Sequence, residues 1–464
     1  MYAAKAACYV ARYYLATVPR LLLLFLLLIA AFHASRVLRE SRPDADRPMD
    51  FRTCYVGQDV LRRGGNPYND TTLKVGWQRI AQREHLASCT QPGLPNLPFL
   101  YPPWAAALFG ASVGQLPYAV AWPLWYALAL LSLGLLAWLW PRVLRAENAP
   151  RVVWWPFLLF ALALKGTVPA LLTGQPTFAA LALGVGALAV AENSPRINVA
   201  ASTATFQLNW VRPLLAGLLL GLAAFKVTLL LPFVAWFLWK KQWLVLAVAA
   251  AVVALLSAVA WHWAAFPTDL LPTYQHLLAQ VRAQSFDPSD PDYPLTQGLT
   301  LRLELGNVLE WLRPGSSAAH PWLHGSLWLA ALARLAWLRR QGQRLAGWYV
   351  FLVVGTLTLL TTYHLYYDAV LLLPLLVFAR HLSWRGQWLL LLALLPLLLP
   401  LNGLALALSN PVGLRFLYFL PPLGVLGVLG VLLARPVNAQ LSAARCQLLV
   451  RSINTDNGER AADN

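Results

Sequence analysis

The chain has 464 residues, of which 59% are hydrophobic and 12% are charged, and its mean hydropathy is +0.55. Soluble domains carry about twice that charged fraction, so the composition excludes a soluble enzyme and indicates an integral membrane protein. The net charge of +17 could suggest nucleic-acid binding, but the lysines and arginines cluster at the ends of hydrophobic runs. That placement is typical of the positive-inside rule and argues against nucleic acid as a partner.

The hydrophobic residues form blocks, several of them close to the roughly 20 residues that a helix needs to cross a bilayer. The first block follows Lys5, Arg12 and Arg20 and lacks a small-residue cleavage site, so we expect a retained first helix. The blocks predict an all-α polytopic membrane protein with about 11–13 transmembrane helices. In chain order the predicted segments are 16–38, 99–116, 118–140, 152–172, 176–191, 213–225, 227–239, 243–264, 321–338, 346–362, 367–380, 386–406 and 416–434.

Charge placement divides the chain into parts on either side of the membrane. The predicted parts are an inner N-terminus with the first helix (1–38), a large outer loop (39–98), a transmembrane core (99–264), a second outer loop (265–320), a further core (321–434) and an inner tail (435–464). One inconsistency remains in the number of membrane crossings. If 39–98 is outside and 141–151 is inside, the chain crosses an odd number of times between them. The segments 99–116 and 118–140 therefore cannot both cross.

The first outer loop is long enough to fold and contains a candidate for catalysis. Asp50 follows the first helix closely, and a carboxylate at the membrane surface could take a proton from an acceptor hydroxyl. The alternative is a solvated loop aspartate. Cys54 and Cys89 lie in the same loop and could form a disulfide in an oxidising compartment, or remain two thiols.

Other polar residues interrupt hydrophobic segments. His364 and Asp368 lie at the outer end of an apolar segment, where ionisable groups are usually functional or paired. Lys226 separates two apolar pieces that are each too short to span the bilayer. A cation at such a helix break could bind a lipid phosphate, or it could extend to the headgroups.

The second outer loop ends in a further group of polar residues. Arg302 could hold phosphate with two donors, and Thr296 and Gln297 precede it. Additional candidates for substrate contact are Tyr55, Tyr68, Tyr101 and Gln175. The sequence contains no Walker loop, CxxC or HExxH motif, and we expect neither a metal nor a cofactor.

Seven short motifs in a fixed order resemble those of glycosyltransferase family 87, within the GT-C superfamily. They are 50-DF, 66-NPY, 101-YPPWAAALFG-110, 174-GQPTFAALALG-184, 216-AGLLLGLAAFK-226, 295-LTQGLTLRL-303 and 367-YDAVLLLP-374. The resemblance covers roughly residues 45–380. It implies a GT-C-type helix bundle that transfers mannose, with inversion, from a polyprenyl-phosphate donor to a lipid-linked or glycan acceptor. It also implies an active site on the outer side of a bacterial inner membrane.

The resemblance assigns roles to particular residues. Asp50 matches the catalytic base, and Lys226 matches a lysine that the family usually follows with proline, where this chain has Val227. His364 is similar in place to a functional histidine of the family, with looser spacing. In this scheme Lys226 and Arg302, with His364, stabilise the departing lipid phosphate. Thr296 and Gln297 replace Asn-Gln-Ser-like residues of the family.

Two other classes of protein would share the hydropathy of this chain. A transporter or flippase of a lipid-linked sugar would place its substrate near the membrane midplane between internal repeats, and no repeat is evident here. A glycan ligase would also act on the outer face and would differ in its donor. The clustering of polar candidates toward one face favours transfer chemistry.

Overall fold

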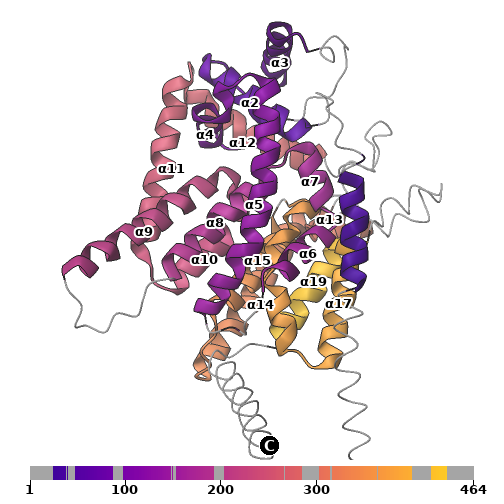
Figure 1. Cartoon of the computed structure of the whole chain (residues 1–464). Coiled ribbons are helices and arrows are strands. Elements are labelled where there is room, and N and C mark those ends of the chain that lie inside the picture. The colour runs from indigo at the N-terminus through magenta and orange to yellow at the C-terminus, as the bar shows by residue number, and fades with distance from the viewer. Residues whose placement is uncertain are drawn as a thin grey trace, which may run out of the picture.

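A computed structural model describes residues 24–37, 39, 48–86, 98–147, 149, 153–192, 203–265, 267–284, 302–313, 316–362, 364–399 and 420–435. Throughout these residues the regular elements are helices, and one isolated backbone bridge pairs Arg302 with Leu365. Together with the apolar character of the helices, this confirms the predicted all-α membrane fold (Figure 1).

Three helical stretches in the described part of the chain are long and apolar enough to cross a membrane. They are α5 (Tyr118–Ala146), α11 (Trp243–Trp263), and Trp210–Leu229, which combines α9 (Thr203–Ala223) with η3 (Ala224–Leu229). The helices α6 (Trp155–Ala163) and α7 (Thr167–Thr173) pass the same test as a pair, bent by 79° at the break between them.

Shorter apolar helices complete the bundle. They are the N-terminal helix Leu24–Val37, α8 (Thr177–Glu192), α15 (Gly347–Thr361), α17 (Trp384–Leu398) and α19 (Leu420–Ala434). Length alone does not make any of them a full crossing. The expected number of 11–13 transmembrane helices therefore stays a prediction.

The stretch predicted as the first outer loop (39–98) forms helices where the structure describes it, as its length suggested. It contains α2 (Met49–Arg62) and α3 (Asp70–Glu84), and α4 (Pro103–Ala111) with η2 (Val113–Gln115) follows. Of the two segments that cannot both cross, 99–116 contains only the nine residues of α4, which span about 14 Å, and this helix packs against α2 and α11. With α5 as the single long helix in 99–147, the inconsistency in the number of crossings disappears.

The remaining elements are mostly short. They are α10 (Leu231–Trp239), α12 (Pro267–Gln284), α13 (Gly306–Leu312), η5 (Ser316–Ala319), α14 (His320–Arg340), η6 (Tyr366–Leu372), α16 (Leu375–Phe378) and η7 (Ala379–His381). The prediction of a continuous helix over 367–380 is wrong, since η6, α16 and η7 occupy it as separate turns. Pro374 lies between η6 and α16, where it cannot donate a backbone hydrogen bond to a continuing helix.

Close helix packing holds the bundle together. Gly217 and Gly221, one turn apart on α9, face Val248 and Val252 of α11, and a Cβ on either glycine would come within 2.6 Å of a valine side chain. Small residues at this spacing let two membrane helices approach closely. At the centre, α15 is buried along its whole length.

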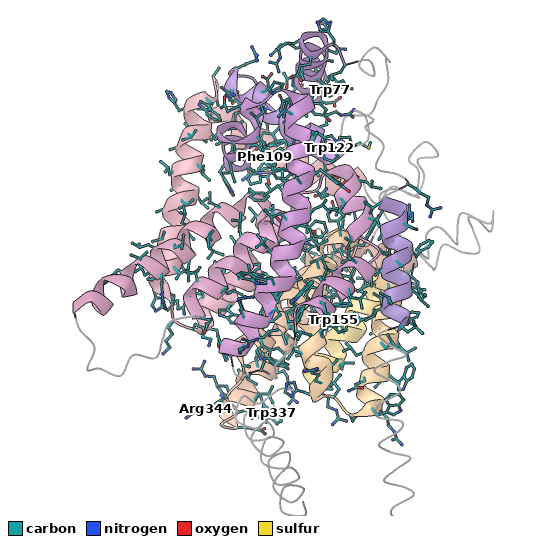
Figure 2. All side chains as sticks on the ribbon, viewed as in Figure 1. Trp77, Phe109, Trp122, Trp155, Trp337 and Arg344 are labelled. Atoms are coloured by element: carbon teal, nitrogen blue, oxygen red, sulfur yellow. The ribbon has the colours of Figure 1, made fainter. Side chains whose placement is uncertain are left out.

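The two ends of the bundle differ in charge. At one end Lys240 pairs with Glu147, and the Arg339 guanidinium lies 5.0 Å from the Trp239 ring. Trp337 and Arg344 lie at this end in Figure 2, whereas Trp77 and Phe109 lie at the opposite end, near α2, α3 and α4. The polar candidates from the sequence therefore have to be located relative to these two ends.

Gly174, which joins α7 to α8, fixes the position of α2. It has a φ of +72°, and a Cβ there would lie 2.6 Å from the Cβ of Phe51 and 2.7 Å from the Trp122 ring. The Gly174 carbonyl accepts a 2.9 Å hydrogen bond from the Trp125 indole. Because Phe51 is the neighbour of Asp50, this contact holds the start of α2 against the end of α7.

We expect Gly174→Ala to lower the melting temperature of the detergent-solubilised protein, because it combines a left-handed backbone with a steric clash. The matched control is Gly134→Ala on α5, where a Cβ would meet no atom within 4 Å. The control should be neutral or slightly stabilising. Equal melting temperatures for the two variants would contradict this account.

Candidate active site

Asp50 lies in the first turn of α2 and is partly exposed. Thr173 at the end of α7 and Gln175 after Gly174 hydrogen bond to its carboxylate. Gln175 itself is held by its backbone N–H, which donates to the Ala170 carbonyl at 2.8 Å, and its side-chain oxygen accepts from the Tyr101 hydroxyl at 3.3 Å. The local structure thus orients Asp50 while leaving it accessible.

The environment of Asp50 tunes its acidity. Burial raises the pKa of the Asp50 carboxyl above its ordinary value, and the hydrogen bonds from Thr173 and Gln175 and the positive charge of Lys226 offset only part of this effect. A carboxylate with a raised pKa is a stronger base once it is ionised. Asp50 is therefore suited to accept a proton.

Lys226 lies at a break between two helices, as the sequence indicated. It is inside η3, with a non-helical φ of −115° and ψ of 78°. The Trp104 indole donates a 2.9 Å hydrogen bond to the carbonyl of Ala224 in the same turn. A side chain from the neighbouring helix α4 thus supplies a hydrogen bond to a carbonyl next to the break, where the regular helical hydrogen bonding is interrupted.

The Lys226 ammonium group is paired. Its Nζ lies 2.6 Å from Oδ1 of Asp368 and donates to the Thr177 hydroxyl at 2.5 Å. Thr177 in turn donates to the same Asp368 oxygen at 3.0 Å. Lys226 and Asp368 are 9% and 2% exposed, so this is a buried ion pair and not a lysine that extends to the headgroups.

Asp368 also orients His364. The His364 Nδ1 lies 2.8 Å from Oδ2 of Asp368, so the ring donates from Nδ1 and directs Nε2 away from the carboxylate. No described residue forms a hydrogen bond with Nε2. His364 is fully buried, so Asp368 holds the ring inside the bundle.

Arg302, the second residue predicted to bind phosphate, lies next to the site because its backbone pairs with the segment that contains His364. Arg302 forms the antiparallel bridge with Leu365, and the Leu303 N–H donates to the His364 carbonyl at 2.9 Å. Arg302 is 3% exposed. Residues from four distant parts of the chain, around 50, 175, 226 and 364, thus form one site, and the segment at 302 borders it.

Two of the three tyrosines that were predicted to contact the substrate also border this site. Tyr101 contacts Gln175 as described, and Tyr68 donates a 3.0 Å hydrogen bond to the Tyr101 carbonyl. Tyr55 does not join them, because it lies nearly opposite Asp50 on α2 and donates to the Leu116 carbonyl. It lines a separate polar cavity of about 520 Å³ with Asp59, Arg62, Arg63, Arg83 and Glu84.

Cys54 forms no disulfide with any residue that the structure describes. Cys54 is a free thiol that is 1% exposed, since it follows Asp50 by one helical turn and faces inward beside Tyr101. Its predicted partner, Cys89, lies outside the described residues, as do Thr296 and Gln297.

Sequence reasoning missed the two threonines of the site. Thr173 and Thr177 flank the Gly174–Gln175 turn that was already a candidate, so the polar spacing around this turn was the available signal. It was weak because threonine is common in membrane helices, where its hydroxyl can bond to its own backbone.

The comparison with family models identifies the class of protein. Residues 99–362, more than half of the chain, match the model of glycosyltransferase family 87. The chain belongs to this family and is a membrane glycosyltransferase of GT-C type. Nothing among curated proteins or solved structures matches the chain. The matched region contains Lys226 and Arg302, whereas Asp50, His364 and Asp368 lie outside it.

The buried pair predicts a specific pattern of stability. Lys226→Met should destabilise the protein by about 3–5 kcal/mol, because it leaves the Asp368 carboxylate buried without its cation. Lys226→Met combined with Asp368→Asn should recover part of that loss. Thermal unfolding of wild type, the two single variants and the double variant in detergent tests this coupling, and purely additive losses would show that the two side chains do not interact.

Proposed function

We propose that this glycosyltransferase transfers mannose from a polyprenyl-phosphate donor to a lipid-linked or glycan acceptor. The observation that carries the proposal is an accessible carboxylate, Asp50, beside a buried cationic network around Lys226 at one end of an apolar helix bundle. A carboxylate suits the acceptor hydroxyl, and cations suit a departing phosphate. The two requirements of the reaction are thus present in one site.

The proposed reaction is a single displacement. Asp50 takes the proton from the acceptor hydroxyl as its oxygen attacks the anomeric carbon of the sugar. The bond from that carbon to the phosphate oxygen breaks, and polyprenyl phosphate leaves with the electron pair. Attack from the side opposite the leaving group inverts the anomeric configuration. Neither a metal nor a cofactor is part of this proposal.

Three basic residues would stabilise the leaving phosphate. Lys226 keeps its orientation through Asp368 and Thr177, while Arg302 and His364 approach from the neighbouring segments. The Nε2 atom of His364 could donate to a phosphate oxygen when the ring is protonated. Fixed donors of this kind need little reorganisation during the reaction.

Charge distribution supports an active site on the outer side. α8 begins at Thr177 in the site and ends at Glu192, beside Lys240. α15 begins at Gly347, beside Glu147, and ends close to His364. The site thus lies at the end of these helices opposite the cluster around Lys240 and Arg339, and strongly cationic ends of membrane proteins face the cytoplasm. In a bacterial inner membrane this orientation exposes the site to the periplasm.

We expect Asp50→Asn to reduce sugar transfer by about 10²–10⁴-fold, the usual contribution of a general base. The assay uses purified protein, radiolabelled polyprenyl-phosphate-mannose and an extract of membrane lipids. The control is Asp59→Asn, which changes the same side chain on the opposite face of α2, in the separate cavity. It should retain activity.

Each outcome of this assay has a distinct meaning. Undiminished transfer by Asp50→Asn would remove Asp50 as the base. Transfer of an intact glycan from a lipid donor, with no use of the mannose donor, would instead favour a glycan ligase. Movement of lipid-linked sugar across a vesicle membrane without transfer would contradict the enzymatic proposal.

The raised pKa of Asp50 predicts the pH dependence of the reaction. The ionised carboxylate is the active form, so kcat/KM should fall as the pH falls through the pKa of Asp50. Because burial raises that pKa, the midpoint of the fall should lie above 3.8. A pH series with the Asp50→Asn protein as reference checks this, and an identical acidic fall in that variant would assign it to another group.

A further inference from the structure

Lys165 lies at the sharp break between α6 and α7. It is 8% exposed, and its Nζ has no hydrogen-bond or ion-pair partner among the described residues. The ring of Tyr366 lies 5.5 Å from the ammonium group. This makes it a buried cation whose charge no described carboxylate balances.

The backbone holds Lys165 firmly in this place. Its N–H donates to the Leu397 carbonyl at the end of α17 at 2.9 Å. The next residue, Gly166, approaches η6 so closely that a Cβ would lie 2.4 Å from the Cα of Tyr367. These backbone contacts therefore fix the position of Lys165 in the break between α6 and α7.

The N-terminal helix lies close to this position. Lys165 and Arg36 both act electrostatically on its His33, and Arg36 also acts on Tyr366, whose ring faces Lys165. The His33 Nε2 is 3.3 Å from the Leu398 carbonyl. The carbonyls of Leu397 and Leu398 are thus already engaged with a backbone N–H and an imidazole.

The contrast with Lys226 is informative. Lys226 has Asp368 as a counter-ion, whereas Lys165 has an aromatic ring. An isolated buried ammonium group costs several kcal/mol relative to water. A bound anion would remove that cost, and so Lys165 is the better candidate for a ligand that carries its own negative charge.

The surroundings indicate a lipid as the source of the anion. The N-terminal helix exposes Leu24, Leu27, Leu28 and Phe32, and α17 exposes Leu389 and Leu392. Apolar side chains on membrane helices face acyl or prenyl chains. A lipid lying along either helix could direct its phosphate toward Lys165.

We propose that Lys165 binds the phosphate group of a membrane lipid, separately from the Lys226 network. The two cations contact neighbouring rings, since Lys226 lies 4.7 Å from the ring of Tyr367 and Lys165 lies 5.5 Å from that of Tyr366. Only the identity of this lipid as a substrate rests on the proposed function. The site binds either the phosphate of the polyprenyl donor or that of a phospholipid headgroup.

Binding to purified full-length protein tests the proposal without turnover. The probes are polyprenyl monophosphate, polyprenol without phosphate, and phosphatidylglycerol, each titrated against protein in detergent. Lys165→Met should weaken binding of a phosphate-bearing lipid by about 10–100-fold, the range for a lost charged hydrogen bond. Lys165→Arg should bind within about threefold of wild type, and polyprenol should bind all variants equally.

Two control variants test whether the effect is specific to Lys165. Asp59→Asn, in the separate cavity on the opposite face of α2, should bind polyprenyl monophosphate as wild type does. Lys74→Met, which removes an exposed lysine on α3, should behave as wild type. Weakened binding of phosphatidylglycerol alone would identify a phospholipid headgroup as the source, and weakened binding of polyprenyl monophosphate would identify the donor.

Stability of the lipid-free protein supplies a second measurement. An unbalanced buried charge predicts a higher melting temperature for lipid-free Lys165→Met than for wild type, and a lower gain from added phosphate-bearing lipid. Equal lipid affinities for wild type and Lys165→Met would overturn the proposal. A lower melting temperature of lipid-free Lys165→Met would overturn it as well, by showing that the chain itself supplies the counter-ion.

Discussion

The buried pair of Lys226 and Asp368 organises the site end of this protein. It joins the break between α9 and α10 to η6, and through Thr177 and His364 it also fixes the start of α8 and the segment before η6. Charges buried in an apolar bundle are costly unless they are paired with good geometry. The irregular backbone at 224–229 and 366–372 is tolerated because side chains from neighbouring helices satisfy it.

Around this pair the protein separates two chemical tasks. Asp50 reaches the site on a helix outside the membrane-spanning segments, and its position depends on Phe51 packing against Gly174. The cations reach it from breaks within the apolar bundle. Proton removal would thus be assigned to the more accessible part, and phosphate stabilisation to the drier part, where electrostatic interactions are stronger.

Hydropathy and isolated polar residues predicted much of this arrangement. The helical class could be predicted from hydropathy, and the break at Lys226 from a charge between two short apolar pieces. The grouping of Asp50, Lys226 and His364 followed from the resemblance to glycosyltransferase family 87. The ion pair itself could not be predicted, since its partners are 142 residues apart. Run length also failed for 367–380, where proline decided the structure. Like Lys226, Lys165 interrupts an apolar stretch, the predicted segment 152–172, but its unbalanced charge is visible only once its neighbours are known.

The short length of α15 has a consequence for the depth of the chemistry. Its 15 residues cover about 22 Å even if the helix stands upright, whereas a bilayer core is about 30 Å thick. Because α15 contacts other helices along its whole length, the bilayer does not have to become thinner to match the length of this helix. The longer helices α5 and α11 contact the bilayer instead. If α15 begins at the cationic surface of the membrane, its other end does not reach the opposite membrane surface. The reacting groups would then lie in a recess below the headgroups, into which the acceptor must descend.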